Sequence, residues 1–397
     1  MRWSPQQDDA LVRVDKWLKN GGPQVFRLFG YAGTGKTTLA KTFAEEIDGV
    51  ALFGAFTGKA AHVMKQKGCT EASTIHSLIY RARPKNGERL EEMKKELKEL
   101  KQDDPRAIAL KTDIEKERSS LKKPSFTLNP DSPVQFADLV IIDECSMVDE
   151  KMGSDLLSFG TKVLVLGDPA QLPPIKGGGF FTERVNPDVM LTEVHRQAKD
   201  SPVVELATMT REKKEIRVGR YGNTEVLSGV KLEPEIVLGF DQVLVGKNVT
   251  RAASNRRYRR LKGFDTPHPE PEDKLVCLRN NHELGLLNGA MFFVDSVESI
   301  DDGKILMDIV SEDGGDPISV LAHEHHFIGE ADRLEWYERL DANEFDFGYA
   351  LTVHKSQGSQ WDNILLFDES SVFRADKWRW LYTGITRAAE AVTIVKM

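Results

Sequence analysis

The junction between an apolar run and a glycine-rich loop restricts the fold of this chain more than any other feature. The run Val25 to Gly30 (VFRLFG) predicts a buried strand, and the apolar positions Leu39, Phe43 and Ile47 predict a helix after it. The nine residues that begin at Gly30, GYAGTGKTT, fit the phosphate-loop pattern GxxxxGK[ST]. This strand–loop–helix order is typical of chains that build a parallel α/β sheet.

Further apolar segments support the same fold class. Residues 51–56, 137–143, 162–168 and 241–246 are short and mostly apolar, and helical patterns follow at about 59–67 and 249–261. Strands that are apolar on both faces indicate a parallel sheet with helices on both sides. We therefore expect an α/β protein.

The length of 397 residues predicts more than one domain. Residues 88–123 are dominated by charged side chains, with apolar residues at heptad-like spacing, which favours an antiparallel helical hairpin broken near 103–105; a solvated charged segment of marginal helicity fits equally well. Residues 264–345 carry short alternating strands and DDG and EDGG turns, which predict a small β-barrel-like insert. The expected division is a first α/β domain (1–80 and 132–190) with a charged insert (81–131), and a second α/β domain (191–263 and 346–397) with the β insert (264–345).

The glycine-rich loop carries a predicted nucleotide site. Its backbone N–H groups can curl around a phosphate, and the helix that follows adds positive potential. Lys36 can reach the β- and γ-phosphates, and the Thr37 hydroxyl can hold Mg²⁺. The predicted ATP-binding residues of this loop are Gly33, Thr34, Gly35, Lys36, Thr37 and Thr38.

Polar residues follow the next two strands where each one ends. Asp143 suits a Mg²⁺ ligand and Glu144 suits the base that deprotonates an attacking water, although a strand end can also turn acidic without any role. Gln171, in GDPAQLPP, can contact both that water and the γ-phosphate. Arg196 in LTEVHRQ and Arg387 in LYTGITRAAE are candidate arginine fingers, and each one alone would be taken for a surface arginine.

Composition adds broad limits. The net charge is −8, but residues 247–262 hold seven Lys or Arg and no acid, so the chain has a local basic patch. The three cysteines (Cys69, Cys145 and Cys277) are far apart, which predicts reduced, buried thiols and no zinc site. No apolar run is long enough for a membrane helix and the N-terminus does not resemble a signal peptide, so we expect a cytoplasmic protein.

Eight segments in order resemble the superfamily 1 helicases, specifically the RecD/Dda-like group. They span Gly30 to Ala388 and are GYAGTGKTT, AFTGKAA, STIHSL, VIIDECSM, GDPAQLPP, LTEVHRQ, LTVHKSQG and YTGITRA. The resemblance implies two RecA-like domains with ATP between them, where Arg196 and Arg387 face Lys36. It also implies that SPQQDDAL holds an adenine-reading glutamine, Gln7 rather than Gln6, and that Gln357 and Gly358 couple the strand and nucleotide sites.

The same resemblance implies a single-stranded DNA site built from short hydroxyl, amide and cationic groups, which suit phosphate and sugar contacts. The matching residues are Thr57, Gly58, Lys59, Thr74, His76, Asn248, Thr250, Thr352, His354 and Lys355. His76 or His354 alone would more often be a core or capping histidine. The arginine-rich helix after Asn248 is expected to flank the strand channel, and a solvated helix face is the less favoured alternative.

The resemblance implies an ATP-dependent DNA helicase that moves 5′→3′ and acts at a duplex junction, in a bacterial cell or a phage-infected host. It would work as a monomer, with replication or recombination proteins as possible partners and no membrane. The group often has a short β-hairpin between STIHSL and the DE motif, whereas this chain has the long charged segment there. Two alternatives therefore stay open: a translocase that remodels without efficient unwinding, and a nucleotide-binding subunit of a larger recombination complex. RNA also stays open as the polymer.

Overall fold

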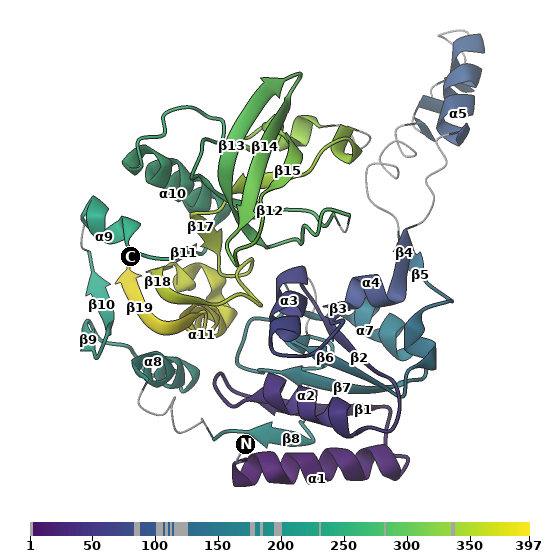
Figure 1. The fold of residues 1–397 in the computed structure, drawn as a ribbon, viewed down its shortest axis with the longest axis vertical. Coiled ribbons are helices and arrows are strands. Elements are labelled where there is room, and N and C mark those ends of the chain that lie inside the picture. The colour runs from purple at the N-terminus through teal and green to yellow at the C-terminus, as the bar shows by residue number, and fades with distance from the viewer. Residues whose placement is uncertain are drawn as a thin grey trace.

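The protein consists of two α/β domains with a smaller β domain beside the second one (Figure 1). The structure is a computed structural model. It describes residues 3–82, 88–100, 106–107, 110–111, 113–114, 126–174, 179–182, 186–193, 201–229, 232–281, 283–334 and 338–397.

The first domain is built on a six-stranded, fully parallel sheet. Its strands, in spatial order, are β3 (Ser73–Thr74), β2 (Ala51–Ala55), β6 (Leu139–Asp143), β7 (Lys162–Gly167), β1 (Val25–Gly30) and β8 (Val189–Leu191). All five residues of β6 are buried, as expected for a strand covered on both faces.

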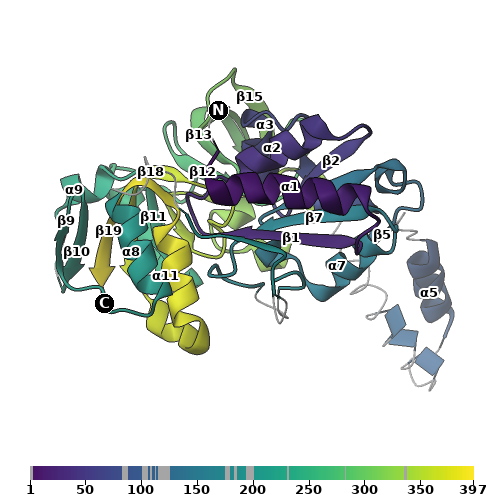
Figure 2. The same cartoon turned by 90° about the horizontal axis from the view of Figure 1, so that it is seen from below.

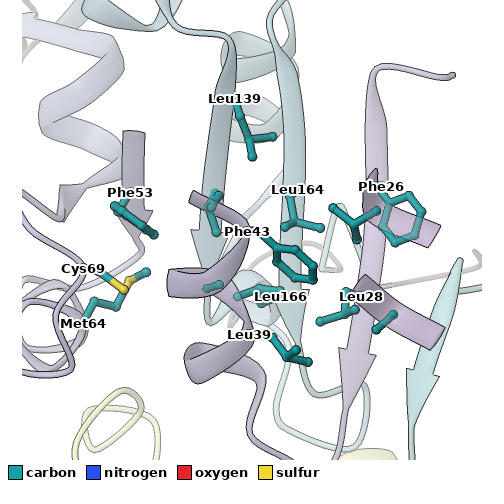
Figure 3. Packing of buried hydrophobic residues seen from close by; sticks show 14 of the residues in the cluster. Phe26, Leu28, Leu39, Phe43, Phe53, Met64, Cys69, Leu139, Leu164 and Leu166 are labelled. Atoms are coloured by element: carbon teal, nitrogen blue, oxygen red, sulfur yellow. The ribbon is translucent and has the colours of Figure 1, made fainter. Parts of the chain in front are cut away.

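Helices cover both faces of this sheet. One face packs against α1 (Pro5–Lys19), α2 (Lys36–Glu46) and α3 (Gly58–Gln66), and the other packs against α4 (Ile75–Ile79) and α7 (Glu150–Leu157). Figure 2 shows α1 running along the sheet from below. Leu28, Leu39 and Leu164 have no exposed surface in the core between the sheet and the first group of helices (Figure 3).

The second domain has a similar sheet with one antiparallel edge strand. Its strands, in spatial order, are β17 (Ala350–Thr352), β11 (Gln242–Val245), β18 (Trp361–Asp368), β19 (Ala388–Lys396), β10 (Thr224–Ser228) and β9 (Gly219–Tyr221). Helices α8 (Pro202–Arg211) and α11 (Lys377–Ile385) pack on one face, and α9 (Pro234–Leu238) and α10 (Asn248–Leu261) pack on the other.

An antiparallel five-stranded sheet, here called the β insert, lies between α10 and β17 in the chain. Its spatial order is β15 (Ile318–His323), β14 (Lys304–Ser311), β13 (Met291–Asp301), β12 (Lys274–Cys277) and β16 (Phe345–Phe347). A bridge between Ala322 and Asn343 brings the end of β15 toward the segment that leads into β16, so the sheet curls toward closure.

The charged segment leaves the first domain on a two-stranded antiparallel ribbon, β4 (Tyr80–Ala82) with β5 (Phe126–Leu128). Helix α5 (Glu88–Glu99) stands away from the rest of the molecule in Figure 1. The expected break near 103–105 lies outside the described residues.

Most of the strands expected from apolar runs are confirmed to within two residues, including β1, β2, β6, β7 and β11, and so is α10. All three cysteines are free and buried, as expected. None of the helices in the described part of the chain has the length and apolar character to cross a membrane.

Candidate functional site

The phosphate loop connects β1 to α2 and depends on glycine backbone geometry. Gly33 and Gly35 have φ values of 77° and 78°, a region in which residues with a side chain are strained. At Gly30 a Cβ atom would lie 2.5 Å from Thr34 Oγ1, so the turn has no room for a side chain there. The loop therefore ends with its N–H groups gathered at the start of α2, which favours an anion.

Lys36 and Thr37 extend from this loop toward the strand ends. Lys36 Nζ donates to the carbonyl oxygens of Gly30 at 2.8 Å and Tyr31 at 3.2 Å. Thr37 Oγ1 donates to Asp143 Oδ2 at 2.8 Å. Hydroxyl and carboxylate oxygens are the ligands that Mg²⁺ prefers, so this pair fits the predicted ion. No cluster of three or more His, Cys, Asp or Glu suited to a metal occurs among the residues that the structure describes.

Glu144 lies directly after β6 in a left-handed backbone conformation, with a φ of 52°. Its backbone N–H donates to Asp143 Oδ1 at 2.8 Å, which orients the Asp143 carboxylate. The pKa of Glu144 is raised, mainly because the group is buried. The charge of Arg387 opposes this rise, and the charge of Asp143 adds to it. The carboxylate is therefore poised to accept a proton more readily than an exposed glutamate.

Asp168 and Gln171 occupy the loop after β7. Asp168 is 1% exposed and accepts hydrogen bonds from Tyr382 Oη at 2.6 Å and from the N–H of Ala170 at 2.9 Å. Burial raises the pKa of Asp168. Gln171 lines the cleft, and its buried Oε1 atom has no hydrogen-bond donor among the described residues. A buried acceptor of this kind is suited to a donor on a ligand or water.

Arg387 reaches the same cleft from the second domain. It is 5% exposed, and its guanidinium donates to the carbonyl oxygens of Thr383 and Ser359, both at 3.2 Å. These carbonyls hold the side chain while its charge acts on Glu144 and Asp168. The second predicted arginine, Arg196, lies outside the described residues.

The cleft between the two domains has a volume of about 670 Å³, which is within the usual range of ligand sites. Most of the residues predicted to bind or hydrolyse the nucleotide line this cleft. They are Gly33, Thr34, Gly35, Lys36, Thr37, Thr38, Asp143, Glu144, Gln171, Gly358 and Arg387.

Tyr382, which the sequence analysis missed, joins the two domains across this cleft. Its hydroxyl donates to Asp168 and accepts a hydrogen bond from the N–H of Ala32 in the phosphate loop at 3.2 Å. The next residue, Thr383, accepts a hydrogen bond from the N–H of Leu172 at 2.9 Å. Both residues lie in the quoted segment YTGITRA, so the signal was present but only its arginine was used.

Arg211 was also missed. The guanidinium of this last residue of α8 lies 3.6 Å from the centre of the Tyr31 ring in the phosphate loop, and both side chains line the cleft. Such a cation–π contact is favourable. Arg211 belongs to none of the recognised segments, so no sequence pattern pointed to it.

The two glutamines near the N-terminus have different surroundings. Gln7 is buried, forms a capping box with Ser4, and donates from Nε2 to the Thr34 carbonyl at 3.0 Å. Gln6 accepts hydrogen bonds from the N–H groups of Thr192 and Glu193 at 2.8 and 3.0 Å. Gln7 is thus the one tied to the phosphate loop, and its reading of adenine stays a prediction.

The predicted strand residues of the first domain lie at two helix N-termini. Thr57 caps α3 and Thr74 caps α4. Lys59 is 8% exposed, and its Nζ donates to Asp313 Oδ2 of the β insert at 2.6 Å. His76 packs against the rings of Tyr80 and Phe126, and burial lowers its pKa, which favours the neutral form.

Gly58 and Gly358 lie where different domains approach closely. A Cβ on Gly58 would lie 2.8 Å from Leu287 of the β insert, and one on Gly358 would lie 2.9 Å from Thr57 Oγ1 and from Ala60 Cβ. The start of α3 is therefore in contact with both the β insert and the second domain.

The predicted strand residues of the second domain surround the start of α10 and the end of β17. Asn248 is exposed at the first position of α10, and Thr250 Oγ1 donates to Glu369 Oε1 at 2.8 Å. Thr352 caps the turn by accepting from the N–H of Lys355 at 3.3 Å, and the His354 ring packs beside Phe373.

Gln357, the predicted coupling residue, is buried and contacts the loop that carries Gln171. Its Nε2 donates to the carbonyl of Leu172 at 3.1 Å, and its buried Oε1 has no hydrogen-bond donor in the described part of the chain. The residue after Gln171 is thus held from both sides by the second domain, through Thr383 and Gln357.

Comparisons with known proteins agree with this architecture. Residues 4–231 match the family described as AAA domain, and residues 347–395 match the family described as UvrD-like helicase C-terminal domain. The first match alone covers more than half of the chain.

Two similar relatives carry helicase names. The ATP-dependent RecD2 DNA helicase of Deinococcus radiodurans is 24% identical over 408 residues, which cover 93% of this chain and 46% of that protein. The ATP-dependent DNA helicase dda of phage T4 is 28% identical over 237 residues, which cover 56% of this chain and 44% of that protein. The chain thus spans less than half the length of either relative.

A solved structure supports the fold. The Pif1 helicase from Bacteroides, in complex with ADP-AlF3 and ssDNA, superposes with a TM-score of 0.54 at 17% identity, covering 99% of this chain and 92% of that one. Two RecA-like domains are consistent with this likeness and with the two parallel sheets. By its matched domains, the chain belongs to the AAA domain family, with a C-terminal part that matches the UvrD-like helicase C-terminal domain, and it is similar to RecD2 and Dda helicases.

Proposed function

We propose that this chain is an ATP-driven motor that moves 5′→3′ along single-stranded DNA and separates strands at a duplex junction. The observation that carries the proposal is the cleft in which the phosphate loop and Glu144 of one domain face Arg387 of the other. Both domains line this cleft, so both would contact a triphosphate bound in it. Cleavage of the triphosphate would therefore change the distance between the two domains. The names of the RecD2 and Dda relatives, and the ADP-AlF3 and ssDNA of the Bacteroides Pif1 complex, support the same ligands here.

The cleft residues divide the hydrolysis chemistry among them. The loop N–H groups and Lys36 bind the phosphates. Thr37 and Asp143 would hold Mg²⁺, which would supply positive charge to a bound triphosphate. Glu144 accepts the proton of the attacking water, and Gln171 orients that water with its unpaired Oε1 atom.

Positive charge from the second domain completes the site. Arg387 offsets the negative charge that spreads over the phosphate oxygens in the transition state. Arg196 supplies a second such charge, and Gln7 reads the adenine ring. These two assignments rest on the family resemblance.

Strand binding is coupled to the cleft through the second domain. The proposed contacts are the hydroxyls, amides and cations around α3, α4, α10 and the segment from Thr352 to Lys355. The same segment continues to Gln357, which holds the backbone after Gln171. Closure and opening of the cleft therefore move one group of strand contacts relative to the other, which gives a step along the polymer.

The cellular setting is part of the proposal. A motor that needs ATP and DNA would act in the cytoplasm, as a monomer, with replication or recombination proteins as partners.

A second candidate, a translocase that remodels without efficient unwinding, is favoured by one observation. The β4–β5 ribbon leads into a long charged segment with the projecting helix α5, where related enzymes often have a short hairpin. Strand-displacement and ATPase assays on the same preparation separate the two, because only a helicase converts hydrolysis into separated strands.

The first test is Glu144→Gln, which keeps the shape of the side chain but removes the base. We expect strand-stimulated ATP hydrolysis to fall by about 10²–10⁴-fold while binding of a fluorescent ATP analogue persists. Glu150→Gln, an exposed position at the start of α7, is the matched control and should hydrolyse normally. Normal ATP turnover in Glu144→Gln would show that Glu144 is not the general base.

The second test addresses the polymer and the direction. ATPase activity is measured with single-stranded DNA, with RNA and without polymer, and unwinding is then measured on duplexes with 5′ or 3′ tails. The proposal expects DNA stimulation and unwinding of 5′-tailed duplexes. Equal turnover with and without any polymer would exclude a strand motor.

A further inference from the structure

A groove with a volume of about 530 Å³ runs between helix α10 and the β insert, outside the nucleotide cleft. One wall is the arginine-rich side of α10, and the other is formed by residues 264–267 and 326–329. The helix lies beside the β insert in Figure 1. None of the groove residues is among those matched to the helicase segments.

The groove has positive charge that the protein does not neutralise. Arg251 pairs with Asp346 at 2.6 Å, and the buried Arg259 pairs with Asp273 at 2.9 Å, so these two cations are occupied. Arg256 and Arg260 are exposed and line the groove, and within the described residues no acid or other acceptor binds their guanidinium groups. The one unpaired acid that lines the groove is Asp265.

The groove also offers an aromatic surface. Phe264 is partly exposed on its wall and is held by cation–π contacts with Arg259 and Lys262, at 5.5 and 5.8 Å from the ring centre. Phe327 and Phe347 lie deeper and are buried. Unpaired arginines beside an aromatic ring are the groups that bind the phosphates and a base of a single strand.

The groove begins at the proposed strand contacts of the second domain. Asn255, which lines the groove, donates from Nδ2 to the carbonyl of Ala350 at 3.4 Å and accepts from the N–H of Ala350 at 2.6 Å, so the groove lies against β17, which leads to Lys355. The opposite end lies at Arg260 and Phe264, near the end of α10. A strand that leaves Lys355 therefore meets a path lined by α10.

We propose that single-stranded DNA continues from Lys355 into this groove, where Arg256 and Arg260 bind two phosphates and Phe264 stacks on a base. The inference rests on the proposed motor function and adds a strand track beyond its motif residues. Its role is to hold the part of the strand that lies outside the channel between the two α/β domains.

The test compares two strand lengths. Binding of fluorescent oligo(dT) of about 8 and about 20 nucleotides is measured by anisotropy over a range of salt concentrations, together with stimulation of ATP hydrolysis. The double variant Arg256→Ala/Arg260→Ala should bind the longer strand roughly tenfold more weakly, and its salt dependence should lose a slope of about 1.4, roughly 0.7 for each phosphate contact of a single strand. Its affinity for the shorter strand and the stimulation by that strand should not change.

Arg257→Ala is the matched control, because Arg257 is an exposed arginine on the same helix, also without an acceptor among the described residues, but does not line the groove. It should behave as the unmodified protein does. Phe264→Leu should weaken binding of the longer strand by roughly tenfold without changing the salt slope, since no charge is lost. Melting temperatures of all variants verify that they fold.

Two results overturn the groove proposal. One is an unchanged affinity and salt slope for the longer strand in the double variant, and the other is an equal loss in Arg257→Ala, which would show a general charge effect. If the shorter strand neither binds to the unmodified protein nor stimulates its ATP hydrolysis, the proposed motor function is wrong, and the groove proposal that rests on it is wrong as well.

Discussion

At the scale of single residues, Tyr382 connects parts of the chain that lie 350 residues apart in the sequence. Its hydroxyl is at once a donor to Asp168 and an acceptor for the phosphate-loop N–H of Ala32. A change in the loop that follows phosphate binding therefore reaches the second domain through one atom.

Replacing Tyr382 with Phe removes both hydrogen bonds. It leaves the buried carboxylate of Asp168 with a single donor among the described residues, the N–H of Ala170, so we expect a loss of about 1–3 kcal/mol in the free energy of unfolding. Strand stimulation of ATP hydrolysis should fall more than the basal rate. The control is Tyr221→Phe, whose hydroxyl bonds to Arg217 at an exposed position, and equal stability of the two variants would contradict the role of Tyr382.

Arg387→Met tests the charge that the second domain contributes. Without an arginine finger, kcat should fall by about 10³-fold. Because Arg387 lowers the pKa of Glu144, its loss should also move the acid limb of the pH–rate profile to higher pH, since Glu144 must be unprotonated to act. The control is Arg379→Met on the exposed side of α11. An unmoved acid limb would mean that Glu144 does not control the rate.

Sequence alone identified Arg387 and Gln357 because each belongs to a segment with a recognisable order of residues. It did not identify Tyr382 or Arg211, whose importance comes from partners in the phosphate loop. Arg211 lies outside every recognised segment, and Tyr382 lies inside one, but the partners of both side chains are distant in the chain and are revealed only by the folded structure.

At the scale of elements, the connection between β14 and β15 covers the start of α3. Glu312 is fixed by Lys274 at 2.7 Å and by the indole of Trp361 at 3.3 Å, and this places Asp313 on Lys59. The Asp313 carboxylate thus pairs with the Lys59 ammonium group, which the family resemblance predicts to bind a phosphate of the strand.

Asp313→Asn should therefore tighten binding of single-stranded DNA. Removing the competing charge should gain about 1 kcal/mol, roughly fivefold in Kd, measured by anisotropy at constant salt. The control is Asp316→Asn, which removes the same charge from the same exposed connection. Asp316 has no partner among the described residues, so this change should alter the affinity little. If both variants tighten binding equally, net charge and not Lys59 is responsible.

The elements that sequence predicted best are those buried on both faces. β1, β6 and β7 are near-continuous apolar runs because helices cover them on both sides, and α10 has a clear polar pattern. By contrast, β4, β8 and β9 have three residues each, and their stability comes from pairing with distant strands or a short hairpin. Three residues are too few to give a periodic signal.

At the scale of the whole molecule, one contact between the two α/β domains is formed where Gly358 meets the start of α3. Gly358 has a φ of 80°, and the added Cβ would lie 2.9 Å from atoms of Thr57 and Ala60. This contact joins the segment proposed to hold the strand in one domain to the corresponding segment proposed in the other.

Gly358→Ala should hold the domains apart at this point. We expect strand-stimulated hydrolysis to fall by about ten- to hundredfold, while binding of the ATP analogue to the phosphate loop persists. Gly285→Ala is the control, because Gly285 has a similar φ of 69° but no atom within 4 Å of the added Cβ. If the two variants are equally impaired, backbone strain and not domain contact explains the loss.

The buried Oε1 atoms of Gln171 and Gln357 lie near the residue Leu172, which links the two domains. Withdrawing an amide oxygen from water without a new donor costs about 1–3 kcal/mol, and the folded chain already carries that cost at both positions. A water or ligand that donates to either oxygen meets an acceptor that has lost its hydration shell in advance. The desolvation of these two oxygens therefore lowers the free energy of unfolding of the chain without bound ligand. The same cost does not arise again when a donor binds, so it does not weaken binding.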